Sequence, residues 1–384
     1  MSLLSSVLVA IVSLVVASLF LSHPSPPSTK DSNSLFKIYP RIGNVTPFHT
    51  HRVHMLYISG FADYDHVRKL LIEEKCGSNN TSQRDVSKCE DELEFEPVKI
   101  VKAAPSSSPI KNNAWDGNHH PPVLTPLIIG NVFYEESSAD SYAELIPGVL
   151  LQKRGSNESV NCQDELCIFN EMFFNRNLIA KLLKTFVNGT KTHRIGRKYL
   201  CVDKYLRRMF YKRDSLMNAI EHVELNIPTL EDDDVTSSLD YQMHLNLNYD
   251  LWSLLKSAIQ MVQSFGIKNV LKLGVQTTLL GLPVQLPLMG VKGISEWKEF
   301  DTRDPILIQN LVLTSPLFPI VKWKELKSNP NNRLIFLEKG DISQYYLPFK
   351  FQPLAVLDLK NAQFVMTPPI NVGSGIGDDE QVKA

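Results

Sequence analysis

The sequence lacks an excess of charge of either sign. Its 40 Lys and Arg residues nearly balance its 41 Asp and Glu residues, which gives a formal net charge of −1. Long-range attraction of nucleic acid needs a strongly basic surface. The pattern also predicts no exposed aromatic platform among the basic residues on which bases could stack. The sequence therefore predicts no nucleic-acid partner.

Cysteine is scarce, since the 384 residues contain only five. Five thiols are too few for a disulfide scaffold, but two bridges and one free thiol suit an oxidising compartment. The simplest pairs are Cys76 with Cys89 and Cys162 with Cys167, and Cys201 can replace either partner of the second pair. Cys162 and Cys167 are separated by four residues, and no second close pair of metal ligands lies near them. A zinc site is therefore not predicted there.

Charge is absent from residues 3–21, which form one apolar run at the start of the chain. A hydrocarbon layer about 30 Å thick needs roughly 20 apolar residues in a helix, and the run just meets that length. It is also longer than the usual apolar core of a cleaved signal peptide and has no basic residue before it. A transmembrane signal anchor and a cleaved signal peptide both remain open.

The side of the membrane on which the body lies is judged from two opposing signals. Lys30, Lys37 and Arg41 follow the run, and basic residues favour the cytoplasmic side. Glycosylation sequons favour the luminal side. The sequons begin at Asn44, Asn79, Asn80, Asn157 and Asn188. We expect a single-pass membrane glycoprotein of the secretory pathway, with a luminal or extracellular body.

The chain is long enough for more than one domain. We expect an α+β protein with an N-terminal transmembrane helix, a mixed α/β middle region with two amphipathic helices, and a C-terminal β-sandwich-like domain with one packed helix. The expected segments are an anchor or signal peptide at 1–22, a Pro/Ser-rich stem at 23–47, strands and loops at 48–160, a helical basic region at 161–225, a β-rich domain at 226–370 and a flexible tail at 371–384.

The two amphipathic helices are predicted at 162–187 and 204–222, where apolar residues recur at helical spacing. The densest basic stretch of the chain lies between and along them. A solvated helix face is the simpler explanation of such charges. Contact with anionic lipid headgroups or an acidic protein partner is the more specific alternative. The residues predicted for that contact are Arg194, Arg197, Lys198, Arg207 and Arg208.

An acidic cluster at 231–234 follows an apolar run that is typical of a strand. Carboxylate oxygens are the ligands that hard divalent cations prefer. Behind an anchor and a stem, this pattern is typical of a type II Golgi-like glycosyltransferase, with Asp232 and Asp234 as metal ligands. Such an enzyme needs parallel strands with intervening helices. The C-terminal strands lack those helices, so this reading is the alternative.

The C-terminal third is rich in predicted strands and contains one amphipathic helix at 251–265, with Asp250 as a cap and Gly266 as its end. Residues 249–256 (YDLWSLLK) and 271–288 (LKLGVQTTLLGLPVQLPL), followed by Gly290 and Gly293, resemble the late-embryogenesis-abundant group 2 domain. The resemblance covers about 245–295. It implies a β-sandwich with one helix, often behind one membrane segment, without known catalytic residues and with suggested lipid contacts.

No catalytic motif and no cofactor motif is recognisable, so the sequence predicts neither catalytic residues nor a cofactor. The leading hypothesis is a membrane-tethered, non-enzymatic module that binds a lipid or a protein.

Overall fold

The computed structural model describes residues 48–76, 90–91, 93–103, 123–156, 159–175, 177–199, 202–215, 219–229, 239–274, 284–289, 306–312, 319–337 and 340–366. The apolar run 3–21, the stem 23–47 and the tail 371–384 lie outside these ranges. No helix within them is long and apolar enough to cross a membrane. The description thus gives no support to the N-terminal transmembrane helix of the predicted fold class, whose residues lie outside it.

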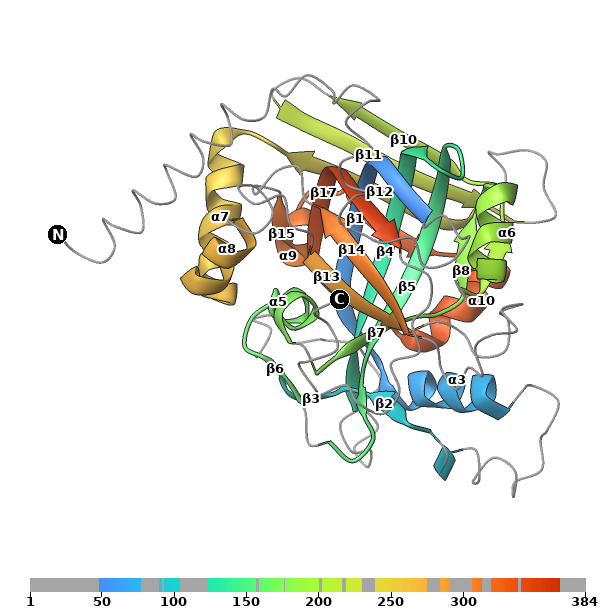
Figure 1. Cartoon of the computed structure of the whole chain (residues 1–384). Coiled ribbons are helices and arrows are strands. Elements are labelled where there is room, and N and C mark those ends of the chain that lie inside the picture. Colours follow the sequence, from blue (N-terminus) through green and yellow to red (C-terminus); the bar gives the residue numbers. More distant parts are fainter. Residues whose placement is uncertain are drawn as a thin grey trace, which may run out of the picture.

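The largest element is an 11-stranded sheet that closes on itself (Figure 1). Its strands follow the order β4-β1-β17-β14-β13-β7-β5-β8-β9, and β4 also pairs with β5, so the path from β4 to β5 forms a ring. Strand β15 adds to β17 and β2 adds to β5. The bounds are β1 (Phe48–Asp63), β2 (Phe95–Pro97), β4 (Leu124–Ser137), β5 (Tyr142–Lys153), β7 (Ile179–Leu182), β8 (Thr185–Val187), β9 (Lys204–Leu206), β13 (Val284–Met289), β14 (Ile306–Val312), β15 (Ile320–Lys322) and β17 (Gln352–Met366).

Strand β1 lies between β4 and β17, so both its edges are hydrogen-bonded and both its faces are covered. Successive side chains of a strand point to opposite faces. Val53 and Met55 belong to one apolar core, whereas Leu56 and Ile58 belong to a second core on the other face. The dense β-branched and aromatic composition of β1 and β4 suits strands that are buried on both sides.

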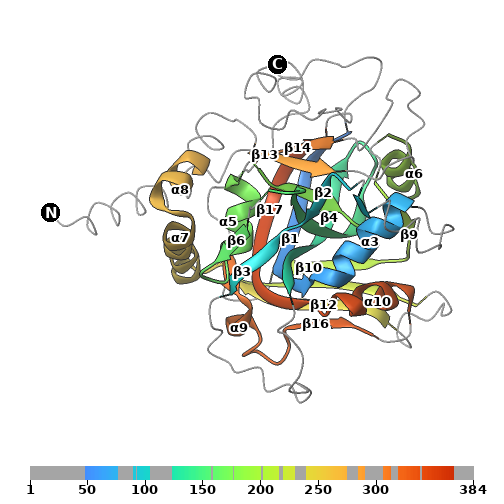
Figure 2. The same cartoon turned by 90° about the horizontal axis from the view of Figure 1, so that it is seen from below.

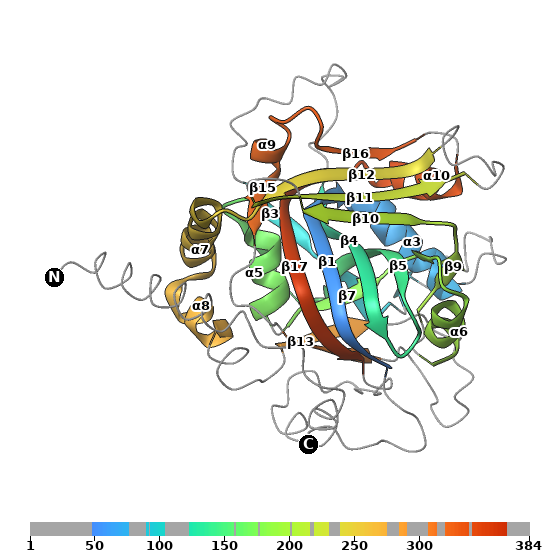
Figure 3. The ribbon, with the colours of Figure 1, turned by 90° about the horizontal axis from the view of Figure 1, so that it is seen from above.

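A second, four-stranded antiparallel sheet packs on the outside of the closed sheet, and its strands run across β1, β4 and β17 (Figure 3). It follows the order β10 (Phe210–Ser215), β11 (Ile220–Pro228), β12 (Leu239–Asn248) and β16 (Arg333–Phe336). Val223 and Leu245 share a core with Leu56 and Ile58. The face of β1 that carries Val53 and Met55 is therefore the face directed into the ring.

Helices cover the edges of these sheets. In Figures 1 and 2, α7 and α8 lie on one side of the molecule and α6 lies on the opposite side. A parallel pair, β3 (Lys99–Ala103) and β6 (Ser159–Cys162), forms a separate small sheet. The helices are α3 (Tyr64–Cys76), α5 (Cys167–Phe174), α6 (Thr190–Tyr199), α7 (Leu251–Phe265), α8 (Ile267–Gly274), α9 (Trp323–Leu326), α10 (Asp341–Tyr346) and the 3-10 helix η3 (Leu347–Phe349).

The predicted helix at 251–265 is confirmed as α7. Its first turn is capped by the Asp250 carboxylate, which accepts a hydrogen bond from the Ser253 backbone N–H at 2.7 Å. It ends at Gly266, whose φ of 79° is in the region that favours glycine. Local signals decide this helix, because cap, apolar stripe and stop all lie within its own residues.

The other two predicted helices are wrong. The region 162–187 contains the short helix α5 and then strands β7 and β8, while 204–222 contains β9, β10 and the start of β11. Apolar residues at helical spacing also fit strands that are buried on alternating faces, because short windows satisfy both periods. Pairing with β5 and β12 decides for strand in these segments.

The predicted C-terminal β-sandwich is also wrong. Strand β17 pairs with β1 from the other end of the described chain, and β13 and β14 complete the same closed sheet. Strands β12 and β16 instead continue β10 and β11. The physical reason is that strand pairing depends on long-range contacts, which a local hydrophobic pattern does not specify.

Candidate functional site

A buried ion pair lies where β8 and β9 join β5. The Lys204 Nζ atom is 2.5 Å from the Glu144 Oε1 atom. Lys204 is 5% exposed and Glu144 is 2% exposed. Glu144 follows Tyr142 by two residues on β5, so it shares the inward face with a residue of the inner core. Lysine and glutamate are almost never buried to this extent without a partner.

Helix α6 makes room for the Lys204 side chain. A Cβ atom on Gly196 would lie 2.4 Å from the Lys204 Cδ atom, so any larger residue would collide with it. One helical turn earlier, the buried Thr192 hydroxyl accepts a hydrogen bond from Lys204 Nζ at 3.2 Å. Lys204 itself is fixed by parallel pairing of β9 with β8. Helix α6 and β9 therefore hold the Lys204 side chain in one position, in the space beside Gly196.

Tyrosine rings surround the Glu144 carboxylate. The rings of Tyr134 and Tyr142 stack with centroids 4.0 Å apart. Burial, followed by the Glu144 charge, raises the pKa of both phenols well above the usual range. The same two causes raise the pKa of Tyr57, whose ring lies against Gly130 on the neighbouring strand. These phenols stay protonated at neutral pH and can act as hydrogen-bond donors.

This arrangement can supply a reactive amine. A lysine amine acts as a nucleophile once an adjacent base, such as a carboxylate, has accepted its proton. Lys204 has such a carboxylate at contact distance, and the surrounding core is apolar. Strongly perturbed titrating groups that cluster around a buried charge pair are typical of functional sites.

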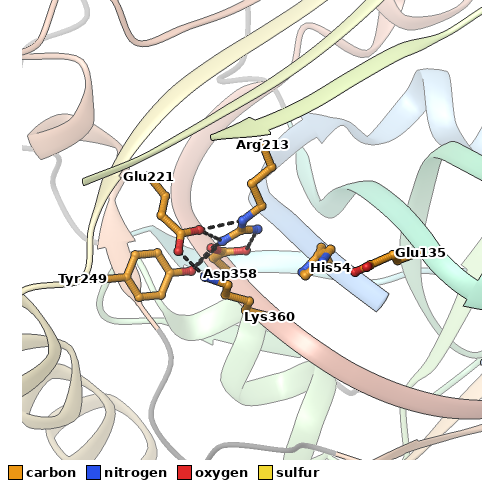
Figure 4. Close-up of polar contacts among 7 residues, drawn as sticks. All are labelled: His54, Glu135, Arg213, Glu221, Tyr249, Asp358 and Lys360. Atoms are coloured by element: carbon orange, nitrogen blue, oxygen red, sulfur yellow. Dashed lines mark hydrogen bonds and ion pairs between the residues drawn. The ribbon is translucent and has the colours of Figure 1, made fainter. Parts of the chain in front are cut away.

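A second polar cluster lies between the two sheets (Figure 4). The Arg213 guanidinium of β10 forms two hydrogen bonds with the Asp358 carboxylate of β17, at 3.1 and 2.6 Å. It also donates to Glu221 at 2.7 Å and to the Tyr249 hydroxyl at 2.8 Å. Lys360 contacts Glu221. Burial lowers the pKa of Arg213, but the charge of Asp358 and its hydrogen bonds outweigh burial and raise it.

The charges of this second cluster balance, since Arg213 and Lys360 face Asp358 and Glu221. Its hydrogen-bond donors are used within the cluster, and its residues come from both sheets. The nearby His54 Nε2 atom lies 3.4 Å from the Glu135 Oε2 atom. Burial, followed by the charge of Arg213, lowers the pKa of His54. We interpret this cluster as the polar joint between the sheets and the Lys204–Glu144 pair as the candidate functional site.

The predicted basic contact residues come from two segments, α6 and the residues directly after β9. Arg194 and Arg197 lie on α6, and the side chain of Lys198 lies outside the description. Arg207 forms an ion pair with Asp341, which uses its charge inside the fold. Arg208 lies over the Phe210 ring at 5.1 Å. Contact of these residues with an anionic lipid or an acidic protein stays a prediction.

The structure places a disulfide between Cys162 and Cys167, with their Cα atoms 5.0 Å apart. Cys76 ends α3, while Cys89 lies outside the described residues. The Asn188 side chain accepts a hydrogen bond from the Ala143 backbone N–H at 2.8 Å. Asn44, Asn79, Asn80 and Asn157 and the metal-ligand candidates Asp232 and Asp234 all lie outside the description.

No known protein family and no curated protein matches the sequence. Several solved structures are similar. An acetoacetate decarboxylase from Legionella pneumophila has a TM-score of 0.41 and 10% identity, over 90% of this chain and 97% of that chain. The enduracididine biosynthesis enzyme MppR, complexed with pyruvate, has a TM-score of 0.38 and 8% identity, over 86% of this chain and 92% of that chain. Similarity at this level assigns no activity or substrate.

These findings correct the predicted function. The non-enzymatic, membrane-tethered binding module and the preference against an enzyme are both withdrawn; the similar solved structures bear the names of enzymes. The predicted single-pass membrane location is not supported: none of the described helices could cross a bilayer, and residues 3–21 lie outside the description. The glycosyltransferase alternative required a parallel sheet, whereas most described strand pairs are antiparallel.

Sequence reasoning missed the pair because its members are far apart in the chain and Lys204 stood among other basic residues. Glu144 carried a recognisable signal: it is the lone charge in the run YAELIPGVLL of β5. A carboxylate at such a position must find a partner when the strand is buried. The sequence alone does not reveal which cation provides it.

Proposed function

We propose that this protein is an enzyme that uses the Lys204 amine to form an imine with a carbonyl substrate. The observation that carries the proposal is the Nζ–Oε1 contact of 2.5 Å between two almost fully buried residues. A buried lysine beside a proton acceptor is a recurrent means of generating an amine nucleophile. The Lys204 side chain packs closely against Gly196, which supports a role that needs this amine in one position.

The proposed reaction balances within the pair. The Lys204 ammonium transfers one proton to Glu144, and the neutral amine attacks the carbonyl carbon. Glu144 then returns its proton to the carbonyl oxygen, which becomes a hydroxyl group. The bound nitrogen gives up a second proton, which Glu144 passes to that hydroxyl group, so that the oxygen leaves as water and a protonated imine faces the Glu144 carboxylate. The iminium draws electrons from the bond next to the former carbonyl carbon. The reaction class is therefore cleavage or formation of a C–H or C–C bond adjacent to a carbonyl group.

Reductive trapping tests the proposal. The full chain is incubated with a panel of small aldehydes, ketones and keto acids, then reduced with borohydride, digested and analysed by mass spectrometry. An imine at Lys204 gives a peptide heavier by the carbonyl compound less one oxygen atom. Lys204→Arg should abolish this adduct, because a guanidinium does not form it under these conditions.

Lys181→Arg is the matched control, since Lys181 is 4% exposed and comparably buried. The adduct at Lys204 should persist in this variant. Equal trapping across surface lysines, or trapping that Lys204→Arg leaves unchanged, contradicts the proposal. Absence of any adduct across the panel identifies the pair as an internal ion pair only.

The role of Glu144 is tested by Glu144→Gln, which keeps the shape but removes the proton acceptor. General acid–base groups typically contribute about 10²- to 10⁴-fold in rate. We expect imine formation in Glu144→Gln to be slower than in the native protein by a factor in that range. Borohydride trapping at short incubation times measures the rate. Circular dichroism verifies that the variant is folded, and a rate unchanged from the native protein argues against proton transfer by Glu144.

A further inference from the structure

A surface cavity of about 270 Å³ lies at one end of the four-stranded sheet. Its walls come from β11 and β12, from α7 and β15, and from α9 with the turn that follows it. Figure 3 shows α7, β15 and α9 gathered at this end of the sheet, with α6 at the opposite end. Pockets for drug-sized ligands measure about 300–1,000 Å³, so this cavity has room for one smaller molecule.

The polar lining of the cavity is rich in carboxamides and has no net charge. Its carboxamides belong to Asn246, Asn248, Gln260, Asn329 and Asn332. Ser253 and Ser257 contribute hydroxyl groups. Among the lining residues, the charged side chains are Lys256 and Glu325, whose Nζ and Oε2 atoms pair at 2.6 Å. The lining therefore offers both donors and acceptors without an unpaired charge.

Hydrogen bonds within the protein hold parts of this wall in place. The Asn332 Nδ2 group donates to the Leu326 carbonyl at 2.9 Å, and Asn332 Oδ1 accepts from the Asn246 backbone N–H at 2.7 Å. On the helical side, the Ser257 hydroxyl donates to the Ser253 carbonyl at 2.9 Å. A ligand would meet side chains that are already positioned, which lowers the entropic cost of binding.

Other polar groups of the lining keep hydrogen-bonding capacity. Asn329 uses its Oδ1 atom, which accepts from the Asn331 backbone N–H at 3.0 Å. Its Nδ2 group and the Gln260 carboxamide make no hydrogen bond to any residue that the structure describes. Beyond their ion pair, the Lys256 ammonium keeps two N–H donors and the Glu325 carboxylate keeps Oε1. These groups are available to a ligand.

Apolar surface completes the cavity. Its aliphatic lining consists of Ile220, Ile320, Val321 and Leu326. Beside it, the Trp252 side chain is 79% exposed. Trp252 lies one helical turn before Lys256 on α7, and residues four apart on a helix are neighbours on its surface. An exposed aromatic ring beside a polar cavity is typical of a surface that binds a ligand.

We propose that this cavity binds a neutral sugar, about one ring in size. Each sugar hydroxyl both donates and accepts, as the carboxamides of the lining do. The paired Lys256 and Glu325 present a charged donor next to a charged acceptor, which suits two adjacent hydroxyls. The C–H face of the ring packs on Trp252 and the aliphatic lining. A charged ligand would find no free counter-charge, because the two charges of the lining neutralise each other.

Saturation-transfer NMR of the full chain with glucose, galactose, mannose, xylose and N-acetylglucosamine tests the proposal. A ligand of about 12 heavy atoms typically binds with a Kd of about 1 mM. We expect at least one of these sugars to bind saturably in that range, with the strongest transfer to the C–H protons of one ring face. The corresponding uronic acid should bind more weakly, because its carboxylate lacks a free counter-charge.

Gln260→Ala should weaken binding of that sugar by about 3- to 10-fold, the loss typical of one hydrogen bond. Gln263→Ala is the matched control, since Gln263 is an exposed glutamine of the same helix and does not line the cavity. Trp252→Ala should weaken binding at least about 5-fold. Leu251→Ala removes a neighbouring side chain that is 59% exposed, and it should leave the affinity unchanged.

The proposal is overturned if no sugar of the panel binds saturably up to about 50 mM. Tighter binding of the uronic acid, or equal affinities of Gln260→Ala and Gln263→Ala, would overturn it as well. Circular dichroism verifies that each variant is folded. These substitutions leave Lys204 and Glu144 unchanged, so borohydride trapping should be the same in every variant. The sugar test and the trapping test therefore fail separately.

Discussion

At the residue scale, the position of Lys204 depends on two glycines without a Cβ atom. A Cβ on Gly196 would collide with the Lys204 side chain, and a Cβ on Gly189 would lie 2.8 Å from the Thr192 methyl group. Both glycines lie at α6, the helix that borders the amine. Glycine inside a helix costs about 0.5–1 kcal/mol relative to alanine. That cost at Gly196 is offset by the ion pair that the open space allows.

Gly196→Ala tests this dependence. The new methyl group would lie 2.4 Å from Lys204 Cδ. We expect the Lys204 side chain to shift away from α6 and to lose its contact with Glu144. We expect borohydride trapping at Lys204 to fall at least about 10-fold, which corresponds to roughly 1.4 kcal/mol. Gly148→Ala is the control, since its Cβ would meet its nearest atoms at an ordinary 3.8 Å. Equal loss in both variants would indicate general destabilisation.

At the element scale, ion pairs join segments that are distant in the chain. Arg213 and Asp358 connect β10 of one sheet to β17 of the other, and Asp358 is fully buried. Lys322 and Lys324, at the end of β15 and the start of α9, hold Glu165 just before α5 at 2.8 and 2.7 Å. The Arg213–Asp358 ion pair is protected from solvent, whereas the ion pairs of Glu165 with Lys322 and Lys324 are partly exposed.

Asp358→Ala should strongly destabilise the fold. The change leaves the Arg213 charge buried beside Glu221 alone, and removal of one partner from a buried pair typically costs about 3–5 kcal/mol. Urea denaturation measures the effect. The control is Asp91→Ala, which removes an exposed pair with Arg154 and should cost less than about 1 kcal/mol. Similar losses in both variants would show that the joint is not stabilising.

The Glu165 bridge predicts an acid-dependent loss of stability. Burial raises its pKa, but hydrogen bonds from Lys322 and Lys324 outweigh burial and lower it to about 2. Because the folded pKa is below the unfolded value, the contribution is complete above the unfolded pKa of about 4.5 and is lost as pH falls towards 2. The native protein should therefore lose more stability than Glu165→Gln between these pH values. Urea denaturation at each pH measures the two losses. An equal loss of stability in the native protein and in Glu165→Gln would contradict the prediction.

At the scale of the whole molecule, the two sheets share one core. Leu56 and Ile58 of the closed sheet contact the same cluster as Val223 and Leu245 of the four-stranded sheet. The Tyr241 hydroxyl of β12 also donates to Asn131 of β4 at 2.6 Å. Neither sheet can expose this face without the other, so we expect the described fold to unfold as one unit.

Leu245→Ala tests this cooperativity. Truncation of a fully buried leucine costs about 2–5 kcal/mol. Far-ultraviolet circular dichroism and tyrosine fluorescence should shift to lower urea concentration together, because both sheets lose the same core. Two separated transitions, with the four-stranded sheet unfolding first, would show that the sheets are independent.

The sequence by itself determined the elements whose signals are local. Helix α7 has its cap, its apolar stripe and its stop within 250–266. Only the tertiary structure decided the remainder. Residues 204–222 satisfy a helical period, but pairing with β8 and β12 makes them strands. The Lys204–Glu144 contact depends on long-range strand pairing, because residues 60 positions apart meet only when β8 pairs with β5 and β9 pairs with β8.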